Sequence, residues 1–188
     1  GTVHAADRSF NNHWGVPLTL SRLPRDADWA VIEIGMNHAG EITPLTTLAR
    51  PHVALVTTVD AVHLENFESV AGIADAKAEI FAGLEPGGAA VINADNPWAE
   101  RLAAQVGQAR IVTFGRAGRD VVPGEPGLSE EATTLEVRVA GTSAFMRIAA
   151  PGRHLADTAC AALAAVHAAG GDTARALIGL SAWRAVGG

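Results

Sequence analysis

Acidic, imidazole and amide side chains recur in this sequence beside short apolar segments, and these residue types suit a site for a metal ion and phosphate groups. The apolar segments are residues 29–34, 53–57 and 89–93. The polar side chains near them are, in chain order, Glu33, Asn37, His38, Glu41, Asp60, His63, Glu65, Asn66, Asn93, Asp95 and Asn96. Carboxylate oxygens are hard ligands for Mg²⁺, and a bound Mg²⁺ neutralises phosphate oxygens. The pattern therefore predicts a metal–phosphate site.

Each of these side chains also has a purely structural interpretation. Glu33 lies inside an apolar segment, where a buried carboxylate without a partner is costly, so it needs a metal ion, an Arg or a proton. His63 could instead bond a loop backbone. Asn96 precedes Pro97, which is typical of a helix start, and Asn12 could belong to an ordinary loop. From the residues alone we favour a functional role for Glu33 only.

Lys77 is the only lysine, since the other 13 of the 14 basic side chains are Arg. It lies in a predicted helix, beside the apolar positions of that helix rather than opposite them. One interpretation is a surface amine whose methylene groups cover apolar surface. The other is a desolvated amine with a lowered pKa. Such an amine can react with CO₂ to form a carbamate, which is an anionic, bidentate metal ligand.

Four apolar segments predict the strands that position these residues: 29–34, 53–57, 89–93 and 110–114. Their apolar residues are continuous rather than alternating, which indicates a parallel sheet covered on both faces. Helical patterns at 41–50, 69–82 and 96–106 lie between or beside the segments. Because ligands of such sheets bind at the carboxyl ends of the strands, we expect the polar side chains to gather at one edge.

The C-terminal part of the chain has a different pattern. Residues 118–131 are rich in Gly, Pro and acidic residues and predict a loop. Residues 133–140 and 143–149 predict a β-hairpin, followed by a helix at about 156–169 and a short helix after Asp172. The predicted fold is α/β, a mostly parallel sheet with helices on both faces, with residues 118–150 as a loop and β-hairpin appendage.

Composition excludes several classes of protein. The 188 residues suggest one domain, and a net charge of −6 without a basic cluster argues against a nucleic-acid partner. No apolar run reaches the ~18 residues of a membrane span. No Gly-x-Gly-x-x-Gly follows a strand, which disfavours a nicotinamide enzyme. Cys160 is the only cysteine, which fits a reducing cytoplasm, and its Ala-rich surroundings predict a buried, inert thiol. We expect a cytoplasmic monomer.

Five stretches of the sequence resemble signatures of the Mur ligase family, in particular of its members that add D-alanyl-D-alanine. They are residues 11–20, 33–42, 62–65, 76–81 and 93–96. Each stretch alone is a weak signal, but their order and spacing match over roughly residues 3–184. On this resemblance, residues 1–188 are similar to the family's central, ATPase-core domain, which has a P-loop-type fold.

The resemblance implies an ATP- and Mg²⁺-dependent ligase of peptidoglycan biosynthesis. It would join D-alanyl-D-alanine to UDP-N-acetylmuramoyl-tripeptide through an acyl phosphate. Glu33 and His63 resemble Mg²⁺ ligands of the family, and Lys77 resembles its carbamylated lysine, which bridges metal and substrate carboxylate. The other implied positions, which would contact the nucleotide, are Asn12, Asn93 and Asn96.

The sequence departs from the family pattern in three respects. It contains no Gly-x-x-x-x-Gly-Lys-Ser/Thr phosphate loop, which in the family would lie roughly 20 residues before Asn11. The family's UDP-binding N-terminal domain and amino-acid-binding C-terminal domain are also outside it. Leu155 and Thr158 stand where the family has two Asn residues near the adenine. We therefore expect this chain to be inactive by itself, and we name no adenine contacts.

Other functions remain open alternatives. A folylpolyglutamate synthase-like ligase shares the core, although the stretches at 11–15 and 37–41 favour the D-alanyl-D-alanine adder. A non-catalytic pseudo-ligase or binding module is favoured by the missing phosphate loop. A metal-dependent hydrolase has candidate ligands without a tight ligand spacing, which disfavours it. Those candidate ligands are His38, Glu41, His63 and Glu65.

Overall fold

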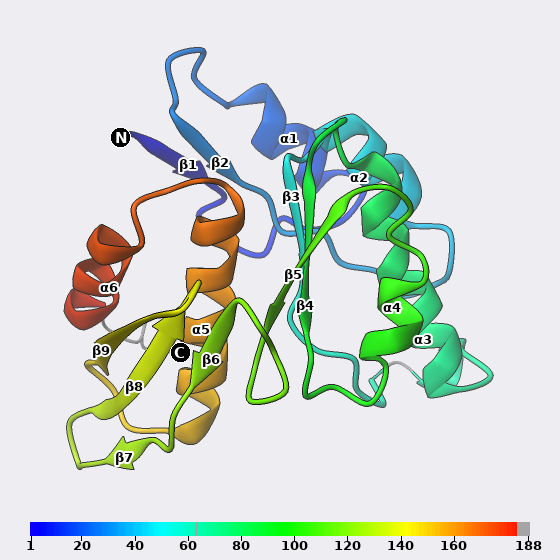
Figure 1. Ribbon diagram of the computed structural model, residues 1–188. Helices are drawn as coiled ribbons and strands as arrows, with labels where there is room; N and C mark the ends of the chain where they lie inside the picture. The colour runs from blue at the N-terminus through cyan, green and yellow to red at the C-terminus, as the bar shows by residue number, and fades with distance from the viewer. Residues whose placement is uncertain (63, 184–188) are drawn as a thin grey trace.

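The computed structural model describes residues 1–62 and 64–183 and has mixed α/β architecture (Figure 1). In the described residues a two-stranded sheet contains β1 (Val3–Ala5) and β2 (Trp29–Val31). A seven-stranded sheet has the order β3-β4-β5-β6-β8-β7, with β9 paired to β8. The fold is therefore α/β, as predicted, with its strands divided between two sheets.

The parallel half of the large sheet contains β3 (Val53–Val56), β4 (Ala89–Asn93), β5 (Arg110–Phe114) and β6 (Val121–Pro123). These strands confirm the predicted strands at 53–57, 89–93 and 110–114. Strand β4 lies between β3 and β5 and contributes to both faces of the sheet. The expectation of a parallel sheet buried on both faces is confirmed for this part of the chain.

Two apolar clusters cover the two faces of β4. Ala90 and Ile92 pack with Ile73 of α3 (Val70–Ala78) and with Leu102 of α4 (Ala99–Ala103). On the opposite face, residues 89 and 91 pack with α5 (Arg153–Ala168). Figure 1 shows α3 and α4 on one side of these strands and α5 on the other. Successive side chains of β4 therefore point to opposite faces of the sheet and contribute to both apolar clusters.

The antiparallel part extends the same sheet. It contains β7 (Gly127–Leu128), β8 (Thr133–Val139) and β9 (Thr142–Ile148). The predicted hairpin is confirmed, and its turn consists of Ala140 (φ 48°) and Gly141 (φ 87°). Both turn residues have left-handed backbone conformations, which suit a tight two-residue hairpin turn.

The prediction of a loop for the whole of residues 118–131 is wrong, because β6 and β7 lie within it. Neither strand has a periodic apolar pattern of its own. Both form by pairing with β8, β6 through Val121 opposite Val139 and β7 through Gly127 opposite Thr134. Pairing with a longer strand, rather than local sequence, decides their conformation.

The prediction of a buried strand at 29–34 is also wrong. Strand β2 ends at Val31, its three residues are exposed, and among the described residues it pairs only with β1. Glu33 therefore lies beyond the strand and is itself exposed. An apolar segment can be buried only if another layer covers it, and the described part of the chain provides no such layer for β2.

The sequence does not predict the first helix, and the second lies close to its predicted range, 41–50. Helix α1 (Gly15–Ser21) precedes β2, and α2 (Ile42–Ala49) ends at Arg50, whose backbone is left-handed. Short 3-10 helices follow, η1 (Leu64–Asn66) and η2 (Glu79–Gly83). The predicted helix 69–82 is thus an α-helix, α3, that continues as η2.

The remaining helices differ from the prediction at their ends, and α4 also ends at Ala103 rather than at about residue 106. Helix α4 starts at Ala99 rather than at Asn96, because Asn96 and Pro97 form a turn in front of it. Helix α5 starts three residues earlier than predicted. Helix α6 (Thr173–Ala182) begins after Asp172, whose carboxylate accepts from the amides of residues 174 and 175. In the described residues, no helix combines the length and apolar character needed to cross a membrane.

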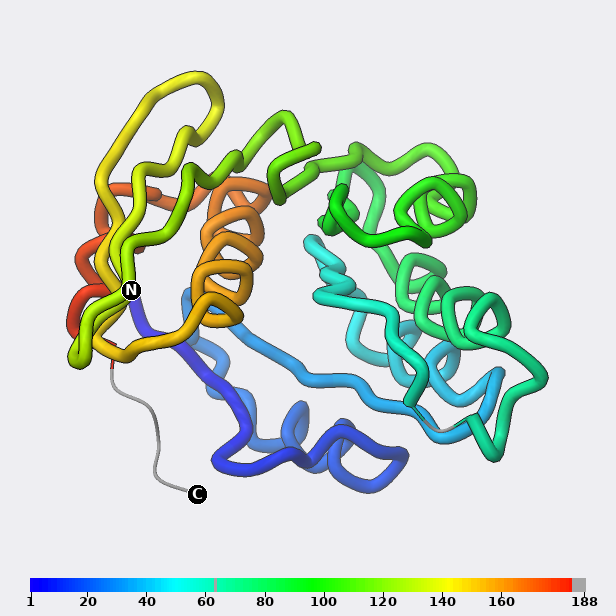
Figure 2. The backbone as a smooth tube through the Cα atoms, turned by 90° about the horizontal axis from the view of Figure 1, so that it is seen from below, coloured from blue at the N-terminus to red at the C-terminus, as the bar shows by residue number. Residues whose placement is uncertain are grey.

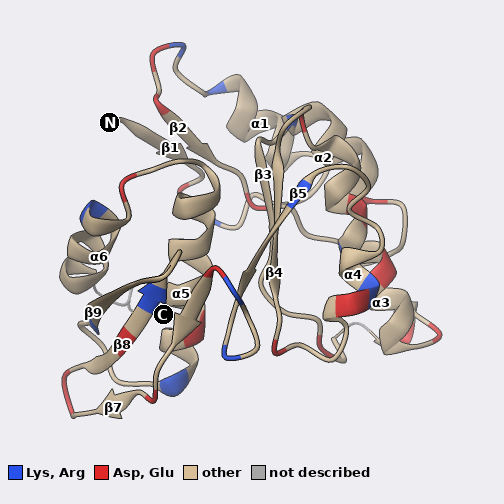
Figure 3. Cartoon of the chain, viewed as in Figure 1, with Lys and Arg blue, Asp and Glu red and all other residues tan. Residues whose placement is uncertain are grey.

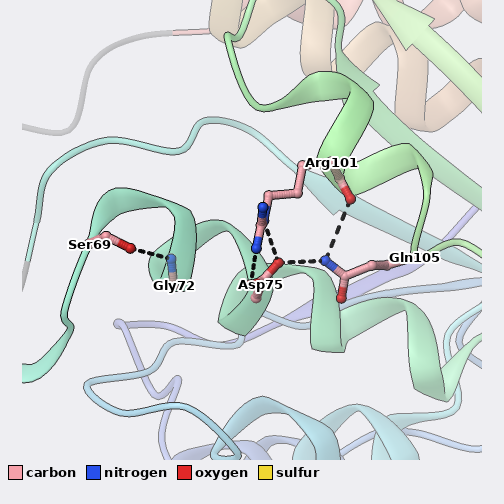
Figure 4. Close-up of polar contacts among 5 residues, drawn as sticks. All are labelled: Ser69, Gly72, Asp75, Arg101 and Gln105. Atoms are coloured by element: carbon pink, nitrogen blue, oxygen red, sulfur yellow. Dashed lines mark hydrogen bonds and ion pairs between the residues drawn. The ribbon is translucent and has the colours of Figure 1, made fainter.

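Helices α3 and α4 are joined by polar contacts on their outer surface (Figure 4). The guanidinium of Arg101 donates to both carboxylate oxygens of Asp75, each at 2.7 Å, and Gln105 donates to the same carboxylate at 2.9 Å. Ser69 accepts from the amide of Gly72 and so caps α3. Because the ion pair is about half exposed, it positions α3 more than it stabilises the fold.

The N-terminal segment contacts the rest of the molecule through Met36, which packs against the α3 cluster, and through α2. Figure 2 shows the segment after β2 crossing from the side of α5 towards α2. There, η2 packs closely on α2: the hydroxyl of Thr46 donates to the carbonyl of Ile80 at 2.7 Å. A Cβ added to Gly83 would lie 2.3 Å from the carbonyl oxygen of Thr46. Only glycine fits at this contact.

We predict that Gly83→Ala destabilises the chain, because the added methyl group collides with backbone rather than with a movable side chain. The expected loss in the free energy of unfolding is about 1–3 kcal/mol. Gly179→Ala in α6 is the matched control, since nothing lies within 4 Å of the added Cβ, and it should stabilise by about 0.5–1 kcal/mol. Urea unfolding measures both; equal stability of the Gly83 variant and the wild type would contradict the prediction.

Candidate functional site

The loops at the carboxyl ends of β3 and β4 are tied together by Asn96. Its side-chain amide donates to the carbonyl of Val59 at 3.1 Å and to the hydroxyl of Thr58 at 3.3 Å. Its side-chain oxygen accepts from the amide of Trp98 at 3.0 Å. Asn96 therefore holds two strand-end loops in place, which agrees with the structural interpretation of this residue.

The loops after β4 and β5 are tied together by Asp95. Its carboxylate accepts from the backbone amides of Arg116 at 2.8 Å and Ala117 at 2.7 Å. Asn93 in turn accepts from the amide of Asp95 at 3.0 Å. A Cβ at Gly115 would lie 2.6 Å from this carboxylate, and the φ of Gly115 is +106°. Three consecutive parallel strands thus end in one connected group of loops, as the strand-end argument predicted.

Glu33 lies at the end of the small sheet and is not the buried carboxylate that its apolar neighbours suggested. Its Oε1 accepts from the side-chain amide of Asn11 at 2.7 Å. The backbone carbonyl of Asn11 accepts from the amide of Gly35 at 2.8 Å. In the described part of the chain no hydrogen bond reaches Oε2 of Glu33, so this oxygen is available to a cation. The sequence did not predict that Asn11 bonds Glu33, although Asn11 adjoins the candidate residue Asn12.

Asn12 lies in the turn that precedes helix α1. Its side-chain oxygen accepts from the amides of Trp14 at 3.1 Å and Gly15 at 2.9 Å. Gly15 allows this turn to close, since a Cβ there would lie 2.4 Å from the backbone of Phe10. The oxygen of Asn12 is thus engaged within the chain, and its amide nitrogen is the part that remains for a ligand.

Lys77 lies half-buried on α3, between the buried residues Ala76 and Ala78. Burial lowers the pKa of its amine below the ordinary value of 10.5, because the charged form loses hydration. Across the described residues, no hydrogen bond or ion pair to this amine is present. A neutral amine is the form that reacts with CO₂, so this observation favours the desolvated interpretation of Lys77.

A preformed cluster of metal ligands is absent from residues 1–62 and 64–183: no three His, Cys, Asp or Glu side chains there could hold an ion together. His63, the histidine candidate, lies outside the described residues. His38 and Glu41 do contact each other, at 3.2 Å. Glu41 also accepts from the amides of Asn37 and His38, and the bond from Asn37 contributes most to the lowered pKa of its carboxyl. These residues thus stabilise their own loop.

A cavity of about 230 Å³ adjoins the connected loops at the ends of β4 and β5. Its lining includes Asp95, Arg116, Pro123, Pro126, Arg153 and Asp157. Two of these residues, Arg116 and Arg153, both pair with Glu125, at 2.7 Å and 2.6 Å. The pKa of the Glu125 carboxyl is lowered, and its hydrogen bond with Arg153 contributes most to this shift. The cavity thus combines carboxylates and guanidinium groups with apolar surface.

The two positions at which the sequence departs from the family pattern lie on the first turns of α5, next to this cavity. Leu155 packs against the apolar core. The hydroxyl of Thr158 donates to the carbonyl of His154, within its own helix.

Further along α5, Cys160 is fully buried, and burial raises the pKa of its thiol to about 12. The expectation of a buried cysteine is confirmed. Figure 3 shows Lys and Arg dispersed over several elements of the described chain.

Comparison with known proteins gives one consistent family. Residues 1–166 match the family described as the Mur ligase middle domain. The chain is 37% identical over 182 residues to UDP-N-acetylmuramoyl-tripeptide–D-alanyl-D-alanine ligase of Escherichia coli strain K12, covering 96% of this chain and 40% of the relative. It therefore spans about two fifths of that relative's length.

Solved structures agree. A crystal structure of MurF from Acinetobacter baumannii superposes with a TM-score of 0.94 at 29% identity, over 98% of this chain and 41% of that one. MurF ligase from Thermotoga maritima in complex with ADP superposes with a TM-score of 0.80 at 22% identity, over 98% of this chain and 43% of that one. The second likeness, at this identity, concerns the fold alone.

We predict that Lys77 titrates at a lower pH in the folded chain than in the unfolded chain. Between the lowered pKa and 10.5 the folded chain binds fewer protons at this group, so the stability contributed by the group rises with pH in that window. NMR of the chain labelled at lysine measures this without ambiguity, because only one lysine exists. Equal midpoints in buffer and in concentrated urea would show that burial does not act on the amine.

Proposed function

Because this chain belongs to the Mur ligase family, we propose that it is the middle domain of a ligase that joins D-alanyl-D-alanine to UDP-N-acetylmuramoyl-tripeptide using ATP. The observation that carries the proposal is the similarity, over nearly the whole chain, to a relative of that name. The same similarity favours this substrate pair over the folates of the alternative ligase. In the complete protein the reaction would contribute to peptidoglycan biosynthesis.

The proposed reaction brings two anions together. ATP transfers its γ-phosphoryl group to the terminal carboxylate of the tripeptide, which forms an acyl phosphate and releases ADP. The amine of D-alanyl-D-alanine then attacks the acyl carbon, the new amide bond forms, and phosphate leaves. Since the carboxylate and the γ-phosphate repel each other, the site must supply positive charge where they meet.

We propose that Glu33, His63 and Lys77 supply the ligands for Mg²⁺ at this site. Glu33 fits the role because one of its carboxylate oxygens is not engaged within the described chain, and carboxylate oxygen is a preferred Mg²⁺ ligand. Lys77 fits it only as a carbamate: its neutral amine attacks CO₂, an N–C bond forms, and a proton is released. Bound Mg²⁺ would neutralise phosphate and carboxylate oxygens there.

We place the nucleotide at the connected loops of β4 and β5. Ligands of open parallel sheets bind outside the carboxyl ends of the strands, and the cavity lined by Asp95 and Asp157 lies at these ends. Asn12, Asn93 and Asn96 are our candidates for contacts with ATP. Because Asn93 and Asn96 already bond neighbouring backbone or side-chain atoms, we infer that they act mainly by holding the loops that face the nucleotide, whereas Asn12 keeps its amide nitrogen for a ligand.

The complete protein would also provide the phosphate loop. We propose that residues 1–188 form the family's middle domain and that the segment preceding residue 1 carries this loop. In the described chain β2 and β3 are each at the edge of their sheets, so each offers one edge to a further strand. A non-catalytic pseudo-ligase is the alternative, favoured by the apolar Leu155 and the internally bonded Thr158 beside the cavity.

We predict that Lys77→Ala and Lys77→Arg both lower the kcat of the complete ligase by roughly 100-fold or more. Arginine keeps the positive charge, but its guanidinium does not form a carbamate, so it does not rescue the reaction. Phosphate release with UDP-N-acetylmuramoyl-tripeptide and D-alanyl-D-alanine measures the effect, with thermal unfolding as the control for folding.

Two outcomes would count against these assignments. Activity close to wild type in either Lys77 variant would remove Lys77 from the site while leaving the reaction intact. A complete wild-type protein that turns over folates, or turns over neither substrate, would instead refute the proposed function.

A further inference from the structure

Glu79 bonds a part of the chain that is distant in sequence. Its Oε1 accepts from the backbone amide of Gly40 at 2.6 Å. Its Oε2 accepts from the backbone amide and from the hydroxyl of Thr43, both at 3.0 Å. Gly40 and Thr43 flank the start of α2, so a carboxylate from η2 caps the N-terminus of a different helix. Such charge-assisted bonds are about twice as strong as neutral ones.

The two segments that Glu79 joins carry two of the proposed site residues. Lys77 precedes Glu79 by two positions, on the last turn of α3. Glu33 lies upstream of Gly40, in the segment that leads from β2 to α2. Because β2 pairs only with β1 among the described residues, the backbone ladder of the large sheet does not hold the Glu33 segment. Met36 of this segment packs against the core cluster that includes α3, and the polar contacts that fix the segment are made through α2.

Those contacts lie at three levels along α2. Glu79 bonds its N-terminus, Thr46 bonds the carbonyl of Ile80 near its middle, and Arg50 pairs with Glu85 at its C-terminus at 2.6 Å. Of these, the Glu79 bonds lie nearest in sequence to both Glu33 and Lys77. The α-helix also ends immediately before Glu79, where the 3-10 helix begins. Glu79 therefore bonds α2 from the point at which the Lys77 helix ends.

We propose that Glu79 is a positioning residue of the ligase site, which holds the Glu33 segment and the Lys77 helix at the separation that the site needs. The inference rests on the proposed function for its consequence in turnover. It does not require Glu79 to touch substrate, nucleotide or metal. A residue that only capped α2 would affect stability, whereas a positioning residue also affects metal affinity and kcat.

Glu79→Gln in the complete protein tests this role, with Glu85→Gln as the matched control. In the Gln variant one of the two acceptor oxygens is replaced by an NH₂ group that faces N–H donors. We expect kcat to fall about 10- to 100-fold, with the KM values for the tripeptide and the dipeptide substrates changed less than about threefold, because reacting groups are misplaced rather than lost. Glu85→Gln weakens a comparable contact at the other end of α2 and should leave kcat unchanged.

Metal binding gives a second readout that does not depend on turnover. Mn²⁺ titrated into the complete protein without ATP and followed by electron paramagnetic resonance should bind about 10-fold more weakly to Glu79→Gln than to wild type. Glu85→Gln should bind Mn²⁺ like wild type. If Glu79→Gln fails to fold, Thr43→Val replaces it, since this change removes only the hydroxyl donor, and a smaller loss in the same direction is expected.

The outcomes separate the two proposals. Unchanged kcat and unchanged Mn²⁺ affinity in a folded Glu79→Gln protein, or equal effects of the Glu79 and Glu85 changes, would overturn the positioning role. Absence of ligation by the wild type would overturn the proposed function alone, because the comparison of Mn²⁺ affinities still tests whether Glu79 positions the site.

Discussion

Strand β4 is buried on both faces, and this burial determines where the polar residues of the large sheet can lie. Its residues alternate between a core built with α3 and α4 and a core built with α5. A strand in this position has no exposed face on which polar side chains could lie. Polar residues are therefore confined to the ends of the strands, and the loops there become the place where chemistry can occur.

Those loops contain many backbone amides, and the side chains first considered as ligand-binding groups are also the partners of these amides. Asn93, Asp95 and Asn96 bond the loops that follow three neighbouring strands. Asn12, just before α1, is likewise both a candidate ligand-binding residue and a hydrogen-bond partner of backbone amides. Loop geometry and ligand binding thus draw on the same residues, because a site with fixed loops needs less reorganisation when a ligand arrives.

The two sheets create a second requirement. Glu33 follows the small sheet, while Lys77 lies on a helix that covers the large one, and no strand pairing joins these sheets in the described residues. Helix α2 and η2 connect the two regions through Glu79, Thr46 and the close contact at Gly83. Lys77, half-buried on α3, has a lowered pKa because of the same packing that places it.

Strands β3, β4 and β5, the approximate helices after β2, the hairpin and the family are predictable from local patterns of apolar residues, caps or signature residues. Lys77 was also identified as unusual from composition and helix position alone. Contacts between distant parts of the chain account for the rest: β2 is exposed, β6 and β7 form on β8, Asn11 bonds Glu33, and Glu79 caps α2. The Asn11–Glu33 bond spans 22 positions of the chain and the Glu79 bonds span 36 to 39. Pairs so far apart have no local periodicity from which they could be predicted.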